Sequence, residues 1–351
     1  MAKIYTLHWD ERDNIRTFVQ NFSMDIYLTL DFELFLGDRS GSVDKCLLET
    51  MERLAETAEA CGARYTLFVD ATYLLRLREL SAAHKELAED YRKVSDTLRG
   101  LSSKGHDIEL HIHPQWAYST YENGEWLLDQ EHYKLSDIDR RTAHRLFAEG
   151  CSLLKEITGK RPVAFRAGGF SAQPTSLLNE LLSANGIKID SSVYAGNSYH
   201  SPQQDYDYTT APIGRPYRFA EDINVPDAEG AVTELPISYH PVSPLYYWRL
   251  VFQRLSKRKC HRRLGDGISV KTAGSSIRRR LTRRTNGFAT IDESKISYLW
   301  DAYKAAKKRG DEMLCVIGHP KLATEYSLKN LPTILRRMKE DGAIFKTIED
   351  L

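Results

Sequence analysis

The sequence has no long hydrophobic run and no paired cysteines. No segment reaches the roughly 18 apolar residues of a membrane-spanning helix, and the N-terminus lacks the apolar core of a signal peptide. We therefore expect a cytoplasmic protein, at most peripheral to the inner membrane. The five cysteines are scattered without a Cys-x-x-Cys pair. This pattern argues against a disulfide framework and against a thiolate zinc site.

The chain also carries almost no net charge, +1 over 351 residues, so its overall charge favours no class of partner. Its basic residues are nevertheless concentrated, because residues 252–285 contain twelve Lys or Arg and a single acid, Asp266. Such a segment is typical of contact with phosphate, an acidic glycan or an anionic membrane surface. A solvated insertion with no binding role is an equally open interpretation, and nucleic acid is a less favoured partner.

Helix and strand patterns alternate along most of the chain. We predict strands at 24–37, 63–74, 105–116, 162–170, 187–194, 233–241, 313–320 and 343–348, and helices at 42–62, 80–104, 136–158, 174–185, 292–308 and 323–340. This alternation predicts an α/β protein with a parallel sheet, open or closed into a barrel. The functional residues of such a sheet gather at the carboxyl ends of its strands.

We read residues 24–351 as one domain that follows an N-terminal extension, 1–23. Two segments interrupt the alternation. Residues 195–231 are rich in Tyr, Pro and Asp and predict a loop insertion, and residues 244–290 enclose the basic segment. There is no internal repeat and no low-complexity linker that would divide the chain further.

A candidate metal site lies in the stretch GHDIELHIHPQW (105–116), which reads as a strand. Side chains two residues apart on a strand point to one face, so Glu109, His111 and His113 share a face. Two adjacent imidazoles with a carboxylate nearby are a plausible metal-binding surface. For an isolated His-x-His, two solvated histidines are about as good an interpretation.

Other strand ends also carry polar residues. Asp31 and Glu33 end the first predicted strand, although ionised carboxylates are costly to bury without a partner. Arg166, Asp190 and His319 end later strands. A structural role remains open for each of them: an ion pair for Arg166, a turn for Asp190 and an ordinary strand end for His319.

Taken in order, these residues resemble the NodB-like polysaccharide deacetylases, carbohydrate esterase family 4. Five short blocks carry the resemblance: TLDFE (29–33), GHDIELHIHPQW (105–116), FRAGGF (165–170), IDSSVY (189–194) and IGHP (317–320). The HxHPQW variant is similar to branches found in lipopolysaccharide and O-antigen gene clusters. The resemblance implies a distorted (β/α) barrel with insertions.

The resemblance also implies roles for individual residues. Glu33, His111 and His113 would hold a divalent metal, with Zn²⁺ expected. Asp31 would be the general base and His319 the general acid, while Arg166 would orient Asp31 and Asp190 would tune His319. Two departures affect this set: Phe32 separates the two acids, and Gln115 stands where the family has its second histidine. We further expect Trp116, Gly168, Gly169 and His240 to contact substrate, Trp116 as a platform for a sugar ring.

The function that follows is a metal-dependent hydrolase that removes an acetyl group from an N-acetylated sugar or polysaccharide precursor. The expected substrate is nucleotide-linked or lipid-linked, in lipopolysaccharide biosynthesis. Two alternatives stay open. One is a hydrolase of another small amide or formamide, and the other is a catalytically silent glycan- or phosphate-binding protein in which Gln115 marks a degraded metal site.

Overall fold

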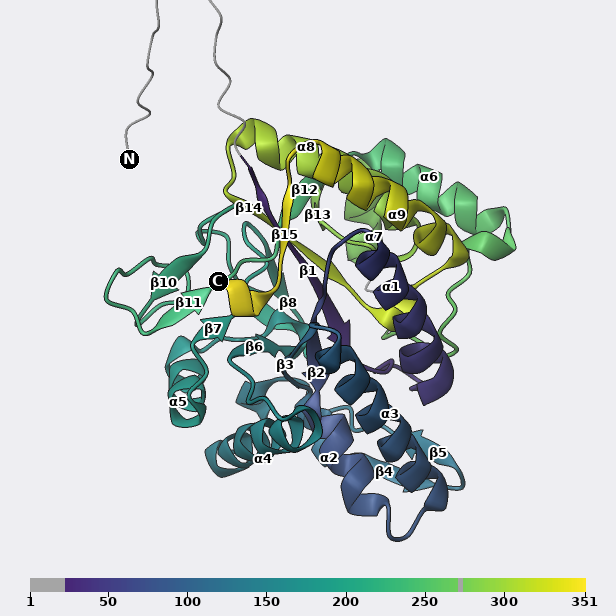
Figure 1. The fold of residues 1–351 in the computed structure, drawn as a ribbon, viewed down its shortest axis with the longest axis vertical. Coiled ribbons are helices and arrows are strands. Elements are labelled where there is room, and N and C mark those ends of the chain that lie inside the picture. Colours follow the sequence, from purple (N-terminus) through teal and green to yellow (C-terminus); the bar gives the residue numbers. More distant parts are fainter. Residues whose placement is uncertain (1–22, 271–273) are drawn as a thin grey trace, which may run out of the picture.

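A curved sheet of mostly parallel strands runs through the centre of the molecule (Figure 1). The structure is a computed structural model that describes residues 23–270 and 274–351, so the predicted N-terminal extension lies outside the described residues except for Ser23. The parallel strands are β1 (Asp25–Phe32), β2 (Thr66–Asp70), β3 (Asp107–Ile112), β6 (Ala164–Ala167), β7 (Ile189–Asp190), β11 (Val232–Glu234), β14 (Met313–Gly318) and β15 (Ile344–Lys346).

The strand order is β10-β11-β7-β6-β3-β2-β1-β14, with β10 (Tyr217–Phe219) antiparallel at one edge. On the side of β1 away from β14, β15 pairs with its first residues and β2 with its last residues. The two ends of the sheet approach each other through residues 235–238. Ile237 donates its N–H to Val193, and Ser238 donates to Cys315 of β14. The sheet therefore curls into the predicted distorted (β/α) barrel.

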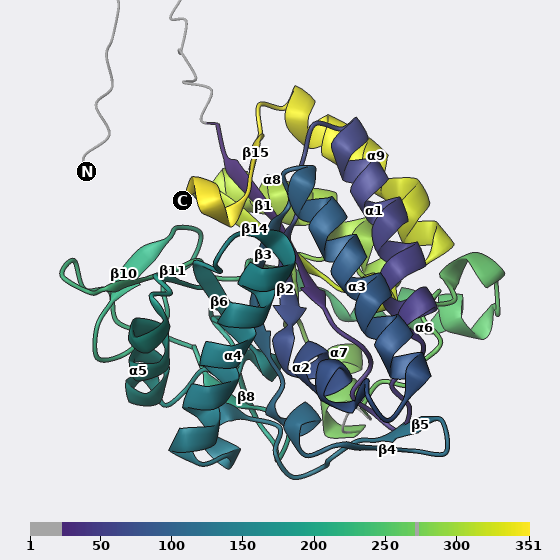
Figure 2. The same ribbon diagram turned by 60° about the horizontal axis from the view of Figure 1, so that its bottom comes forward.

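Helices cover the outside of this curved sheet, and Figure 2 shows α9, α1, α3, α4 and α5 following one another around it. The helices are α1 (Glu49–Ala60), α2 (Ala71–Leu80), α3 (Lys85–Ser103), α4 (Arg140–Thr158), α5 (Thr175–Asn185), α6 (Pro244–Leu255), α7 (Gly274–Thr282), α8 (Leu299–Arg309) and α9 (Glu325–Glu340). Close packing fixes their positions. A Cβ at Gly150 of α4 would lie 3.0 Å from Leu110 of β3. Among the described residues, no helix has the length and apolarity needed to cross a membrane.

Several predicted strand boundaries are wrong: the strand predicted at 24–37 ends at Phe32, and the strand predicted at 105–116 ends at Ile112. Two other predicted strands differ more. The strand predicted at 63–74 ends at Asp70, because the carboxylate of Asp70 accepts the N–H of Tyr73 at 3.3 Å and caps α2. The strand predicted at 233–241 divides into β11 and β12 (Tyr239–Val242). β12 pairs with β13 (Thr285–Phe288) in a separate two-stranded sheet.

Residues 195–231 are not an unstructured loop. They contain β8 (Ser198–His200), β9 (Asp205–Asp207) and β10. Tyr206, Tyr208 and Phe219 are buried from this segment, so its aromatic residues belong to the core. Strands β4 (Thr120–Glu122) and β5 (Glu125–Leu127) form a hairpin. Helices α6 and α7 and strand β13 lie in the predicted basic insertion.

Candidate metal and catalytic centre

Three potential metal ligands meet where strands β1 and β3 end. Glu33 follows β1, His111 lies in β3, and His113 follows β3. One ligand atom from each lies within 4.8 Å of the others, and all three residues are buried. Oε2 of Glu33 lies 2.5 Å from Nε2 of His113 and 3.3 Å from Nε2 of His111. Two imidazole nitrogens and one carboxylate oxygen form a donor set that suits Zn²⁺ or a similar divalent ion.

The imidazoles are oriented by the neighbouring strand β6. Nδ1 of His111 lies 2.7 Å from the backbone carbonyl of Arg166, an acceptor that places the proton on Nδ1 and leaves Nε2 free for a metal. Gly168 lies against the other ring, because a Cβ there would stand 2.7 Å from Nδ1 of His113. Gly168 thus leaves the space that the His113 ring requires. Its contact with substrate stays a prediction.

A buried lysine that the sequence patterns did not single out contacts the same carboxylate. Nζ of Lys321 donates to Oε1 of Glu33 at 2.8 Å and to the carbonyl of Leu34 at 2.6 Å. Burial alone would raise the pKa of Glu33, but the charges of Lys321 and His113 and the hydrogen bonds of both histidines lower that pKa well below its usual value. Glu33 is therefore an ionised carboxylate with one oxygen facing the histidines.

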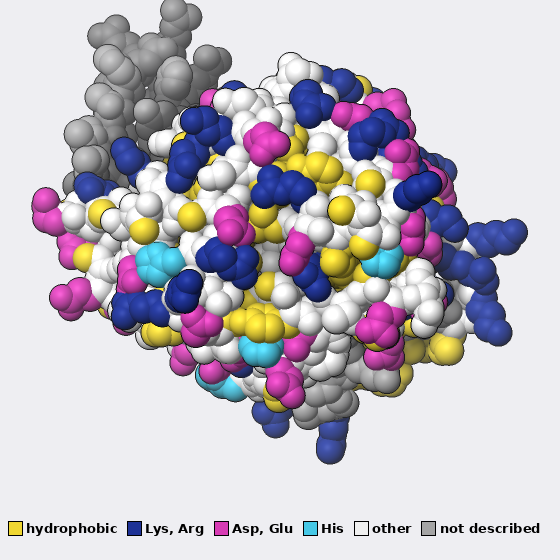
Figure 3. Space-filling model, turned by 90° about the horizontal axis from the view of Figure 1, so that it is seen from below, with side chains coloured by type: hydrophobic (Ala, Val, Ile, Leu, Met, Phe, Trp, Pro, Cys, Tyr) yellow, Lys and Arg dark blue, Asp and Glu magenta, His cyan; other side chains and the backbone are white. Residues whose placement is uncertain are grey.

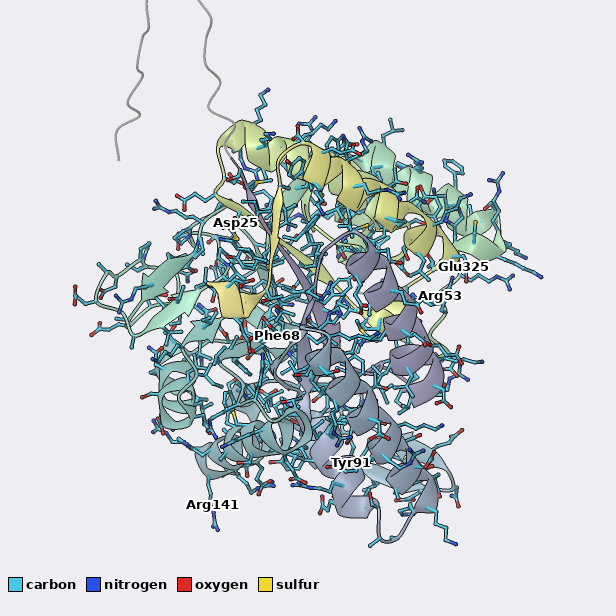
Figure 4. All side chains as sticks on the ribbon, in the orientation of Figure 1. Asp25, Arg53, Phe68, Tyr91, Arg141 and Glu325 are labelled. Atoms are coloured by element: carbon cyan, nitrogen blue, oxygen red, sulfur yellow. The ribbon has the colours of Figure 1, made fainter. Side chains whose placement is uncertain are left out.

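Asp31 is held by a buried arginine. Nη1 of Arg166 donates to Oδ1 of Asp31 at 2.7 Å, and both side chains are buried. The guanidinium also donates to Thr29 and to Ser191, and it lies over the ring of Phe68 with 4.1 Å between its carbon and the ring centroid. Figure 4 labels Phe68 near the centre of the molecule. Oδ2 of Asp31 is left facing His319, at 3.6 Å from Nε2.

His319 follows β14 and completes the group. Its Nε2 lies 3.7 Å from Oε1 of Glu33. On its other side, Nδ1 lies 2.9 Å from Oδ2 of Asp292, whose Oδ1 accepts the His319 backbone N–H at 2.8 Å. Burial lowers the pKa of His319, but the negative charge and hydrogen bond of Asp292, together with Asp31 and Glu33, raise it above its ordinary value. The imidazolium is thus favoured in this position.

Solved structures share this architecture. No family model matches the chain, and neither does any curated protein. A probable polysaccharide deacetylase from Pseudomonas aeruginosa PAO1 is 14% identical, with a TM-score of 0.51 over 94% of this chain and 90% of that one. The fold is that of a polysaccharide deacetylase. A putative polysaccharide deacetylase from Mycobacterium smegmatis (16% identical, TM-score 0.49, covering 95% and 91%) and the Puue allantoinase (15% identical, TM-score 0.48, covering 95% and 90%) are also similar.

The partner predicted for His319 is wrong. Asp190 does not contact His319 but lies in β7, where it accepts hydrogen bonds from the hydroxyl and the N–H of Ser192. It also stands in register with Glu234 of β11, and both carboxyls are fully buried. Asp292 occupies the position next to His319 instead. Asp292 follows the basic insertion, outside any strand, so no strand-end pattern identified it.

The predicted sugar platform is also wrong. Trp116 is fully buried and packs against Tyr73 and Trp126, with ring centroids 4.7 and 5.1 Å away. Its ring belongs to the core under α2. Gln115, which stands where the resembled motif has its second histidine, is fully buried as well. The second imidazole of the candidate site is that of His113.

The other two predicted substrate contacts lie in different settings. Gly169 follows Gly168 with φ +59, and a Cβ there would stand 3.1 Å from the side chain of Gln204. Gly169 lies near the candidate metal site because it directly follows Gly168. His240 lies in β12, where its ring stacks on Tyr298 with 6.0 Å between centroids. Burial lowers the pKa of His240. Its contact with substrate stays a prediction.

Proposed function

We propose that this chain is a metal-dependent hydrolase that removes an acetyl group from an N-acetylated sugar or polysaccharide precursor. One observation carries the proposal: the three candidate ligands Glu33, His111 and His113 lie next to an Asp31–His319 pair at one edge of the barrel. Zn²⁺ is the ion we propose for this donor set. When bound, such an ion lowers the pKa of a water molecule and polarises the acyl carbonyl.

Two residues beside the ligands, Asp31 and His319, carry out the two proton transfers. Asp31, whose Oδ1 is held by Arg166, uses Oδ2 to accept the proton of the attacking water. His319 donates the proton of Nε2 to the departing amine. Asp292 accepts the Nδ1 proton, so the transferable proton of the imidazolium faces the site. Arg166 and Asp292 are positioning residues in this scheme, because each acts through the group that it holds.

We further propose that the substrate carries phosphate, as a nucleotide-linked or lipid-linked acetylated sugar of lipopolysaccharide biosynthesis in the cytoplasm. The similarity of the HxHPQW stretch to deacetylases of such gene clusters supports the pathway. The basic insertion supports the phosphate, because Arg and Lys side chains are its usual ligands.

The test is acetate release from a panel of acetylated nucleotide sugars and lipid-linked sugars, measured for the wild type and for Asp31→Asn. We expect turnover of at least one member, and a loss of roughly 100-fold or more in the variant, which is the usual size of a general-base effect. The metal content of the variant should be unchanged, since Asp31 is not one of the three ligands. An equally active Asp31→Asn enzyme would remove Asp31 from this role.

Two other functions fit the same fold. A hydrolase of another small amide or formamide would use the same residues, and only the substrate panel separates it from the deacetylase. A silent glycan- or phosphate-binding protein is less well supported, because His113 supplies the second imidazole although Gln115 replaces the usual one. A protein that binds no metal would favour the silent alternative.

A further inference from the structure

Helix α6 turns a stripe of large apolar side chains outward. Leu245, Trp248, Phe252 and Leu255 follow one another at intervals of three or four residues, which places them on one face of the helix. Their exposed fractions are 79%, 45%, 64% and 69%. An amphipathic helix of a globular protein normally turns such a stripe toward the core. A contiguous exposed stripe instead marks a surface that contacts something else.

Positive charge surrounds this stripe. Helix α7 packs beside α6, and Nε1 of Trp248 donates to the carbonyl of Leu281 at 3.2 Å. Ile277 of α7 adds one more exposed apolar side chain. The exposed basic residues of the two segments include Arg249, Lys257, Arg258, Lys259, Arg262, Arg278, Arg279, Arg280, Arg283 and Arg284. Figure 3 shows Lys and Arg side chains projecting at the margin of the molecule where Figure 1 places α6.

Acidic residues are almost absent from this part of the chain. Asp266 is the only acid between residues 243 and 291. Its half-buried carboxylate is already engaged, because it accepts the N–H of Ser42 at 2.8 Å and the Ser42 hydroxyl at 3.0 Å. The surface formed by α6 and α7 therefore combines exposed apolar side chains with exposed positive charges.

A hollow beside α6 has the same mixed character. Its volume is about 640 Å³, and its lining includes Phe252 and Tyr246 together with Arg249 and Arg258. Apolar side chains next to guanidinium groups suit a molecule that has an acyl chain and a phosphate. Phospholipids combine these two groups.

We propose that the α6–α7 surface docks onto an anionic phospholipid membrane. The apolar stripe would enter the boundary between headgroups and acyl chains, and the Arg and Lys side chains would contact the lipid phosphates. A second copy of this chain fits less well, because two such surfaces would bring like charges together. Nucleic acid fits less well too, since a phosphate backbone offers nothing to four exposed apolar side chains.

The chain segment between α6 and α7 contacts the loops of the candidate catalytic centre. Residues 264–268, which connect η5 (Lys259–His261) toward α7, pack on the loops that carry the site. Leu264 donates its N–H to Ala323 at 2.9 Å, and Ile268 donates to Arg39 at 2.8 Å. Gly265 lies on the backbone of Lys321. If the proposed function holds, membrane docking favours the lipid-linked class of substrate over the soluble nucleotide sugar.

Vesicle flotation tests the docking without any catalytic readout, so its failure is distinct from failure of the proposed function. The full chain is mixed with vesicles of phosphatidylcholine alone or of equal amounts of phosphatidylcholine and phosphatidylglycerol. We expect flotation with the anionic vesicles only, weakened by salt because salt screens exposed charges. Phe252→Ser/Leu255→Ser should abolish flotation. Matched substitution of two exposed apolar residues elsewhere, Leu127→Ser/Val225→Ser, should leave flotation unchanged.

Charge variants test the second component. Arg278→Gln/Arg279→Gln/Arg280→Gln should weaken binding on the order of 100-fold, because each basic residue at an anionic surface contributes a factor of about five. Three exposed cations elsewhere, substituted as Arg141→Gln/Lys308→Gln/Arg336→Gln, form the control and should bind like the wild type. An equal loss in both triple variants would overturn the specific role of α7.

Trp248 gives a measurement that can be made on the wild-type chain. Its fluorescence should be quenched by brominated phosphatidylglycerol, and Trp248→Phe should still float but lose that quenching. Wild-type protein that floats with neither vesicle type would overturn the proposal. So would a Phe252-dependent dimer seen by light scattering without vesicle binding, or binding to duplex DNA alone.

Discussion

The buried carboxylate of Asp292 and the half-buried ring of His319 form a pair that spans two segments of the barrel, with Oδ2 of Asp292 2.9 Å from Nδ1 of His319. A second hydrogen bond, from the His319 backbone to Oδ1, fixes the carboxylate relative to the strand end. The pair resembles the carboxylate partners that orient catalytic and metal-bound imidazoles elsewhere. Asp292 thus takes the place that the sequence assigned to Asp190.

We expect Asp292→Asn to lower kcat by roughly 10- to 100-fold, the usual effect of removing an outer carboxylate partner of an imidazole. The metal content should not change, because Asp292 is not one of the three ligands. Asp190→Asn serves as the comparison, since Asp190 makes no contact with His319. If the folded Asp190→Asn protein lost more activity than Asp292→Asn, the assignment would be reversed.

Lys321→Met should destabilise the metal-free protein by about 3–5 kcal/mol, because it leaves the Glu33 carboxylate buried without its cation. A bound metal supplies positive charge to the same carboxylate, so the loss should be smaller when metal is present. Urea unfolding in the presence of a chelator and in the presence of Zn²⁺ measures both values. Identical losses under the two conditions would show that Lys321 does not act through Glu33.

The Asp190–Glu234 pair makes stability depend on pH. Burial, followed by the charge of Asp190, raises the pKa of Glu234 well above its usual value. A carboxyl that holds its proton more tightly in the folded state stabilises the fold fully below the unfolded-state pKa, about 4.3. That contribution is lost as pH rises through the raised value. Stability should therefore fall as pH increases across this window.

Glu234→Gln isolates that effect, because glutamine keeps the shape and stays neutral. The difference in unfolding free energy between wild type and variant should favour the wild type most at acidic pH and should shift toward the variant as pH rises. Parallel pH profiles for the two proteins, measured by urea unfolding, would contradict the assignment of the proton to this pair.

Apart from Asp190, the sequence locates the residues of the candidate centre that lie at strand ends, and it misses those that do not. Asp31, Glu33, His111, Arg166 and His319 converge because parallel strands present their carboxyl ends at one edge. The periodic patterns that locate strands therefore locate these residues too. The βα alternation likewise predicts the parallel sheet, and the resemblance to the deacetylases predicts that it closes into a distorted barrel.

Periodic sequence patterns do not identify residues that reach the site only through tertiary contacts. Asp292 follows a long insertion with no recognisable register, and Lys321 reads as an ordinary surface lysine until Glu33 is seen beside it. Trp116 shows the opposite error, because an aromatic in a loop suggests a ligand platform whereas here its ring fills the core. Helices α6 and α7 lie in the segment for which the sequence predicted a basic insertion and no helix.

One exposed ion pair illustrates how little surface charge contributes to stability. Arg53 and Glu325 join α1 to α9 with 2.7 Å between their charged atoms, and Figure 4 labels both at the outside of the molecule. Exposed pairs of this kind contribute about 0.2–1 kcal/mol. The buried contacts of Arg166 and Lys321 fix the candidate centre far more tightly.

Metal content tests the central claim most directly. Elemental analysis of the wild type should give about one equivalent of a divalent metal, and His111→Ala/His113→Ala should give none. His144→Ala/His200→Ala, a pair of histidines outside the site, should retain the wild-type content. A wild type that holds no metal after supplementation, or a double variant that holds as much as the wild type, would contradict the assignment of Glu33, His111 and His113 as the metal site.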